Sequence, residues 1–219
     1  RDLVRSRGLG DVYKRQLMTS CGEYQSLLKS NDYNLVYKKA IEYYNKGDYQ
    51  RAMNLLDGVR SVFVGQAKAQ NIAYYRAFCS YNMKDYQIAS DLFKQFIQTY
   101  PESSFAEECL YMMGFCDYKA SPKPRLDQQV TEKAIREFQL YLSRYPYSMR
   151  KDKVNTYMDE MRDKLSYKAY LSAKNYYLRE HYKAAVISLQ NCLKDYPGSK
   201  YREEIMYMLF VSKYQMAVN

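Results

Sequence analysis

Apolar positions recur along the chain at fixed distances from a tyrosine–proline stop. Three segments end alike, in TYPESS (99–104), RYPYS (144–148) and DYPGS (195–199). An alanine stands twelve residues before each proline, and apolar residues follow that alanine by four and by seven positions. Such spacings place side chains on one face of a helix. The pattern predicts amphipathic helices that end before each proline, because proline cannot continue them.

A second small residue lies upstream of each of these helices and predicts a partner helix. Polar turns such as NKGD, NMKD and LREH separate the two helices. Paired small residues allow two helix axes to approach closely, so each unit is expected to be a helical hairpin. The third pair is wider because the loop KASPKPRLDQQ (119–129) contains two prolines. The pairs are Ala40/Ala52, in a further copy with Val64 in place of the proline, then Ala77/Ala89, Gly114/Ala134 and Ala173/Ala185.

One hairpin cannot bury its own apolar stripe, so neighbouring hairpins must stack. The predicted fold is therefore all-α, a solenoid of tetratricopeptide-like helical hairpins. The small residue, aromatic, alanine, large apolar residue and proline of that repeat are matched by Ala77, Tyr81, Ala89, Phe93 and Pro101. A second set of matches is Ala173, Tyr176, Ala185, Leu189 and Pro197. Full copies are expected near 33–66, 70–103, 107–148 and 166–199, and 203–217 resembles the first helix of a fifth.

The segment 150–178 contains no helix breaker, and apolar residues recur in it at helical spacing. It predicts one helix of roughly 40 Å. We divide the repeats into an N-terminal array (32–148, three copies) and a C-terminal array (149–219, the fourth copy and part of a fifth). Apolar residues of 203–217 need a covering helix, so a C-terminal truncation is expected; they include Ile205, Met206, Leu209 and Phe210.

The chain has 27 tyrosines and no tryptophan, and the tyrosines follow the repeat. Each first helix carries one tyrosine three residues before its central position and one four residues after it. Seven residues are two helical turns, so the members of a pair share a face. These rings either line a groove for an extended, aromatic-rich peptide or pack between adjacent repeats. The pairs are Tyr37/Tyr44, Tyr74/Tyr81, Tyr111/Tyr118, Tyr170/Tyr177 and Tyr207/Tyr214.

Composition and charge exclude several other functions. The net charge of +10 is scattered, without the concentrated cations of a nucleic-acid surface. No apolar run approaches the length of a membrane span. No CxxC motif occurs and His181 is the single histidine, so neither a zinc site nor another metal or cofactor is expected. Four of the five cysteines are expected to be buried free thiols: Cys79, Cys109, Cys116 and Cys192.

No catalytic residues are apparent, and a non-enzymatic protein is expected. The sequence contains neither a glycine-rich phosphate loop nor a Ser/His/Asp set. His181 is expected at the surface, in a turn. Adjacent carboxylates on a helix face different directions and so do not share a site. These carboxylate pairs are Glu107/Glu108, Asp159/Glu160 and Glu203/Glu204.

The N-terminal segment has a different character from the repeats. Residues 1–16 interleave charged residues with glycine, where a signal peptide would be apolar, and are expected to be a non-native leader. In LMTSCGEYQSLLKS (17–30), an apolar residue and two small residues precede Cys21, which is similar to a bacterial lipobox. We therefore expect lipidation at Cys21, with 17–31 forming the lipobox remnant and a short polar tether.

Together, the cysteine, the tether and the repeats resemble the BamD family of the β-barrel assembly machinery, in a Bacteroidetes-like form. The stretches that carry this resemblance include SCGEYQSLLKSNDY (20–33), PRLDQ (124–128) and DYPGSKYREE (195–204). It implies a non-enzymatic scaffold, lipid-anchored to the periplasmic face of the outer membrane. Its C-terminal repeats would bind BamA, placing the partner surface at Tyr170, Tyr177, Tyr207 and Tyr214. Its N-terminal repeats would receive the targeting strands of unfolded outer-membrane proteins, at Tyr37, Tyr44, Tyr74, Tyr81, Tyr111 and Tyr118.

Two other functions are compatible with the repeats. Aromatic platforms also stack on sugars, so a periplasmic lipoprotein that binds glycan or peptidoglycan remains an alternative. A cytosolic co-chaperone adaptor is the other, although such adaptors clamp a terminal carboxylate with lysine and asparagine, whereas tyrosines occupy this face. The lipidation state of Cys21 would distinguish the cytosolic alternative.

Overall fold

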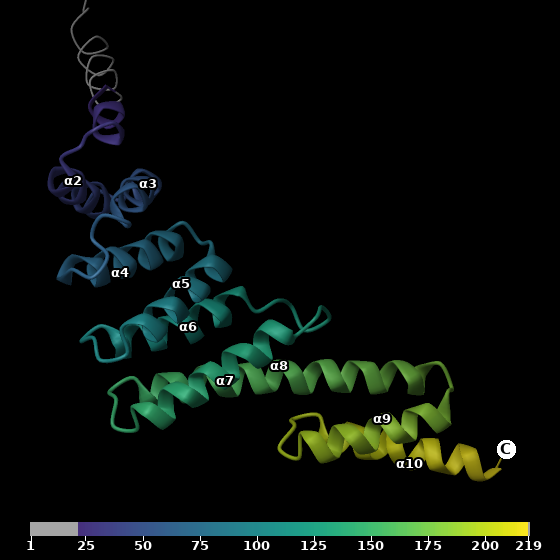
Figure 1. Ribbon diagram of the computed structural model, residues 1–219. Coiled ribbons are helices and arrows are strands. Elements are labelled where there is room, and N and C mark those ends of the chain that lie inside the picture. Colours follow the sequence, from purple (N-terminus) through teal and green to yellow (C-terminus); the bar gives the residue numbers. More distant parts are fainter. Residues whose placement is uncertain (1–21, 219) are drawn as a thin grey trace, which may run out of the picture. The chain divides into compact units, whose positions relative to one another are not determined.

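The structure, a computed structural model, describes residues 22–218, and every regular element in that range is a helix (Figure 1). The chain has an all-α fold of stacked tetratricopeptide-like hairpins, as predicted. None of the described helices is long and apolar enough to cross a membrane. The chain divides into two compact units, with the boundary between Cys109 and Leu110.

The first unit contains two hairpins, which correspond to the first two predicted copies. Helix α2 packs against α3 and α4 packs against α5, while α3 also contacts α4. The hairpins therefore stack in chain order. The helices are α2 (Tyr33–Asn45), α3 (Tyr49–Val59), α4 (Ala67–Asn82) and α5 (Tyr86–Thr99).

The second unit begins within α6 and ends with the long helix and its partners. Helix α8 has 28 residues, about 42 Å at 1.5 Å per residue, which confirms the prediction of one uninterrupted helix. Helix α9 packs against both α8 and α10, and α7 contacts α8. The helices are α6 (Ala106–Ala120), α7 (Gln129–Arg144), α8 (Lys151–Leu178), α9 (Tyr182–Asp195) and α10 (Arg202–Val218).

The polar turns inside three of the hairpins share one backbone conformation. Gly47, Lys84 and Glu180 occupy the same place in their turns, with φ angles of 81°, 67° and 60°. The next residue donates its backbone N–H to a carbonyl five positions earlier, for example Asp48 to Tyr43 at 3.0 Å. This is a Schellman-type helix end, which satisfies carbonyls that the helix leaves free. The turn thus fixes how the two helices of a hairpin meet.

The small residues that define the repeat lie in the core of each unit, as the sequence predicts. Each is fully buried, and large side chains such as Phe93 and Phe138 fill the space beside them. The hairpins are consequently held together mainly by burial of apolar surface. The buried alanines are Ala40, Ala52, Ala77, Ala89, Ala134, Ala173 and Ala185.

Residues 22–28 are helical and packed, although their polar composition suggests a free tether. Tyr24 and Leu27 are buried in the core of the first unit. Tyr24 accepts a hydrogen bond at its hydroxyl from Asn54 Nδ2 at 3.1 Å and lies edge-on to the Tyr43 ring. Two apolar side chains one turn apart are enough to dock so short a helix. The predicted leader (1–16) and Cys21 lie outside the described residues.

Gly114 is the one small position of the repeat where even a methyl group does not fit. A Cβ atom placed there would lie 2.9 Å from the Phe138 ring, closer than van der Waals contact allows. Phe138 is fully buried and has no room to move aside. The repeat therefore has glycine at this position because the Phe138 ring occupies the space that a Cβ would need.

We predict that Gly114→Ala destabilises the protein by about 1–3 kcal/mol, since it overpacks the core. Gly58→Ala is the matched control, because nothing lies within 4 Å of a Cβ at Gly58, near the end of α3. Replacing a helical glycine without strain should stabilise by up to about 1 kcal/mol. Urea unfolding of both variants measures these changes in the free energy of unfolding. Equal changes in the two variants would contradict overpacking at Gly114.

In the second unit the carboxyl group of Glu137 is buried next to another carboxylate, that of Asp117. Burial and the neighbouring Asp117 carboxylate raise the pKa of Glu137, and Lys133 offsets this only in part. The Lys133 ammonium lies 2.8 Å from Asp117 Oδ2 but 3.7 Å from Glu137 Oε1. The charge of Lys133 therefore mainly stabilises the Asp117 carboxylate. The folded protein favours the protonated form of Glu137.

The raised pKa of Glu137 predicts a loss of stability with rising pH. Above about pH 4.3, unfolded chains release the Glu137 proton while the folded protein retains it, which favours unfolding. Glu137→Gln removes this titration, so its free energy of unfolding should fall less than that of the wild type between about pH 5 and about pH 8. Glu132→Gln, on the exposed side of α7, is the control. Parallel pH profiles for wild type and Glu137→Gln would contradict this assignment.

Candidate functional site

The predicted tyrosine face of the first unit is half-buried, between the repeats. Tyr74 donates its hydroxyl to Glu108 Oε2 at 2.9 Å, and Tyr44 accepts from Asn82 Nδ2 at 3.5 Å. The Tyr44 ring also meets the first helix of the next copy, with its centroid 4.9 Å from that of Tyr75 on α4. Packing between repeats thus covers part of the Tyr44 and Tyr74 rings. The half-buried members of this unit are Tyr37, Tyr44, Tyr74 and Tyr81.

In the second unit the tyrosines differ strongly in exposure. Tyr111 and Tyr170 retain only 7% and 5% of their exposed surface, so these rings pack in the interior. Tyr118 and Tyr177 are half-buried. On α10, Tyr207 and Tyr214 are 65% and 58% exposed. The same position in the repeat is therefore buried in two copies and open to solvent in a third.

We call the ten paired tyrosines the tyrosine ladder, and three of them donate a hydrogen bond to a glutamate of the following repeat. Tyr74 reaches Glu108 and Tyr170 reaches Glu204, in both cases 34 residues further along the chain. Tyr118 reaches Glu160, with the longer offset that the 121–128 loop introduces. We call these tyrosine–glutamate contacts the inter-repeat latches. They link neighbouring hairpins by a charge-assisted bond in addition to the apolar contacts.

Sequence reasoning missed the role of these glutamates. It considered the three carboxylate pairs only as catalytic groups, and in the structure the second member of each pair accepts a tyrosine hydroxyl. The signal was present in the sequence, because Tyr74/Glu108 and Tyr170/Glu204 share the 34-residue offset typical of tetratricopeptide repeats.

The environment of three ladder tyrosines, Tyr44, Tyr74 and Tyr118, raises their pKa values and keeps them protonated. Burial raises the pKa of Tyr44 to about 12. The hydrogen bond to Glu160 and, to a smaller extent, burial raise the pKa of Tyr118 to about 12. Burial and the bond to Glu108 also raise the pKa of Tyr74. The phenols therefore remain hydrogen-bond donors throughout the physiological pH range.

The four described cysteines are free and buried, as predicted. Burial raises the pKa of Cys79 and of Cys109 to about 12, so these thiols are poor nucleophiles. His181 is exposed at the start of α9. Among the described residues, no three histidine, cysteine or acidic side chains are grouped to hold a metal ion.

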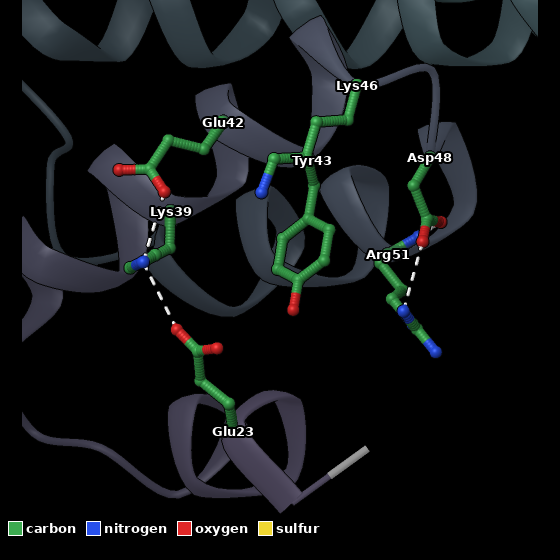
Figure 2. A pocket seen from close by; sticks show the side chains of 7 residues that line it. All are labelled: Glu23, Lys39, Glu42, Tyr43, Lys46, Asp48 and Arg51. Carbon is green, nitrogen blue, oxygen red and sulfur yellow. Dashed lines mark hydrogen bonds and ion pairs between the residues drawn. The ribbon is translucent and has the colours of Figure 1, made fainter. Parts of the chain in front are cut away.

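A charged pocket of about 300 Å³ lies where residues 22–28 meet the first hairpin (Figure 2). Lys39 stands between Glu23 and Glu42 and lies 3.1 Å from a carboxylate oxygen of each. Arg51 pairs with Asp48 at 3.2 Å. Because these charges neutralise one another, the pocket serves to attach the short helix to the hairpin.

The stacked hairpins, with a ladder of partly exposed aromatic rings, define a repeat protein of the tetratricopeptide class. Residues 29–219 match the YfiO family, described as outer membrane lipoprotein. The chain therefore belongs to this family, which is that of BamD, and the resemblance inferred from the sequence is confirmed. Membership associates the chain with the outer membrane. No curated protein matches the chain.

We predict that Tyr170→Phe lowers the free energy of unfolding by about 1 kcal/mol, because the buried hydroxyl contacts both Glu204 and Lys174 at 2.7 Å. Tyr207→Phe is the matched control: it occupies the same position one copy later but is exposed. Tyr207→Phe should change the free energy of unfolding by no more than about 0.5 kcal/mol. Urea denaturation of the two variants makes the comparison, and an equal loss in both would refute a stabilising latch at Tyr170.

Proposed function

We propose that this protein is a non-enzymatic lipoprotein scaffold of the β-barrel assembly machinery. It binds BamA and the targeting strands of unfolded outer-membrane proteins during their insertion into the outer membrane. A lipid on Cys21 anchors it to the periplasmic face. The observation that carries this proposal is membership of an outer membrane lipoprotein family over residues 29–219.

The tyrosine ladder supplies surface suited to a targeting strand. In the first unit the hydroxyls of Tyr44 and Tyr74 are bonded to the next repeat, while the rings remain partly exposed. A ring held in this way loses little entropy when an aromatic or apolar side chain packs on it. The proposed contacts in this unit are Tyr37, Tyr44, Tyr74 and Tyr81.

Tyr111 and Tyr118 complete the proposed peptide-binding set, in the second unit. Their exposures indicate unequal contributions. Tyr118 is half-buried and can offer part of its ring, whereas the 7% exposure of Tyr111 leaves little surface for a ligand. We assign Tyr111 a supporting role, in which it positions neighbouring rings such as Phe115, stacked at 5.7 Å.

The fourth and fifth copies offer an apolar surface for BamA. On α10, Phe210 is 72% exposed, and Met206, Tyr207 and Tyr214 are exposed on the same helix. Aromatic residues and methionine are enriched at protein interfaces. We assign the partner contact to this face, with Tyr177 beside it and the largely buried Tyr170 stabilising the hairpin underneath.

Co-purification tests the scaffold directly. The full-length lipoprotein, expressed with its cognate BamA and extracted in detergent, should retain BamA. Phe210→Glu should strongly reduce BamA recovery, because it places a charge at the centre of the proposed contact. Ile187→Glu, at an exposed apolar site on α9, is the matched control and should leave recovery unchanged. Absence of BamA from the wild-type preparation would overturn the proposal.

A peptide titration tests the ladder separately. A peptide that ends in an aromatic residue, as a barrel targeting strand does, should change tyrosine fluorescence saturably, whereas peptidoglycan fragments should not. The reverse preference would favour a glycan-binding function.

A further inference from the structure

A second groove, of about 840 Å³, lies in the second unit beside α8. Its size is that of a site for a short peptide segment or a small molecule. Its lining contains no acidic residue. The side chains that define its chemistry are three tyrosines, Tyr167, Tyr170 and Tyr201, and three cations, Arg125, Lys168 and Lys174.

The tyrosines form a compact aromatic stack. The rings of Tyr170 and Tyr201 are parallel within 14°, with centroids 4.4 Å apart. Tyr167 lies 5.3 Å from Tyr201 and 6.1 Å from Tyr170. The inter-repeat latch from Tyr170 to Glu204 holds the stack in position. The groove thus has a rigid aromatic wall that loses little entropy on binding an apolar side chain.

The loop 121–128 at the edge of this groove is an insertion relative to the other copies, yet it is firmly held. Lys168 Nζ donates to the Leu126 carbonyl at 2.8 Å, and Gln128 Nε2 donates to the same carbonyl at 3.1 Å and to that of Lys123 at 2.8 Å. Lys164 Nζ donates to Ser121 Oγ at 2.7 Å. These bonds fix the loop backbone from which Arg125 projects to line the groove.

The cations of the groove are unequally neutralised. Lys174 is paired with Glu204 at 2.7 Å. Lys168 donates only to a neutral carbonyl, and Arg125 forms no ion pair with any described residue. The groove therefore carries two positive charges without a carboxylate partner, next to an aromatic wall and the exposed Leu178.

We propose that this groove binds an extended acidic segment of a protein partner, in which carboxylates alternate with apolar or aromatic side chains. A carboxylate pairs with the Arg125 guanidinium, whose planar fork matches it in bidentate geometry, and Lys168 adds a second positive charge. The neighbouring apolar side chain packs on the tyrosine wall. This inference rests on the groove alone and does not depend on the anchor or on BamA.

Fluorescence anisotropy with the full chain tests the proposal. The probe is an end-capped, fluorescein-labelled peptide that alternates Asp and Glu with Phe and Leu, and its comparison peptide has Asn and Gln in place of the acids. The acidic peptide should bind at least about tenfold tighter, because its affinity includes charge-assisted pairs. Added salt should weaken the binding of the acidic peptide, since the cations of the groove are solvent-accessible.

Two single-charge variants locate the site. Arg125→Gln should lower the affinity for the acidic peptide by about tenfold, because it removes the unpaired guanidinium. Lys123→Gln removes the same charge from the same loop, but Lys123 does not line the groove, so affinity should change less than about twofold. Unchanged thermal unfolding of both variants shows that the fold is intact.

Three results would overturn the proposal. Equal affinity for the acidic and neutral peptides would remove the role of charge. Equal effects of Arg125→Gln and Lys123→Gln would indicate a diffuse basic surface. Vesicles of anionic phospholipid that bind in an Arg125-dependent way, while neither peptide binds, would assign the groove to lipid headgroups instead.

Discussion

A single helical hairpin cannot bury its apolar stripe, and this constraint governs the rest of the structure. Each copy must be covered by the next, and small residues, the alanines and Gly114, are buried where large side chains such as Phe138 need the space. The three inter-repeat latches add a polar bond to the apolar contact at Tyr74, Tyr118 and Tyr170. A buried or half-buried phenol is satisfied by a glutamate of the following copy, as Tyr74 is by Glu108.

This arrangement gives one residue type two uses. The hydroxyl and one side of the ring stabilise the stack, and the remaining ring surface faces outward in the half-buried positions. Packing and the proposed binding are therefore compatible at Tyr37, Tyr44 and Tyr74, whereas Tyr170, at 5% exposure, contributes mainly through packing. Where no following copy is described, on α10, the same positions are exposed.

The sequence predicted most of the fold, because spacing alone reports helices, stops and small contact positions. The long helix α8 was predicted because its segment contains no helix breaker. The free, buried cysteines were predicted because their spacing does not match a metal site. The sequence did not predict the packed helix of 22–28, since two docked side chains, Tyr24 and Leu27, leave too short a pattern. The latches were not predicted, although the 34-residue offset between Tyr170 and Glu204 is visible in the sequence. The bond that fixes the 121–128 loop joins Lys168 to Leu126, 42 positions apart, and follows no repeat offset.

A double-mutant cycle on Tyr74 and Glu108 tests the central claim, that a tyrosine–glutamate bond couples consecutive repeats. The free energy of unfolding would be measured for the wild type, Tyr74→Phe, Glu108→Ala and the double variant. The latch predicts a coupling energy of at least about 0.5 kcal/mol, because removal of either group already breaks the bond. Additive losses, with a coupling energy near zero, would show that the hairpins are held by apolar packing alone.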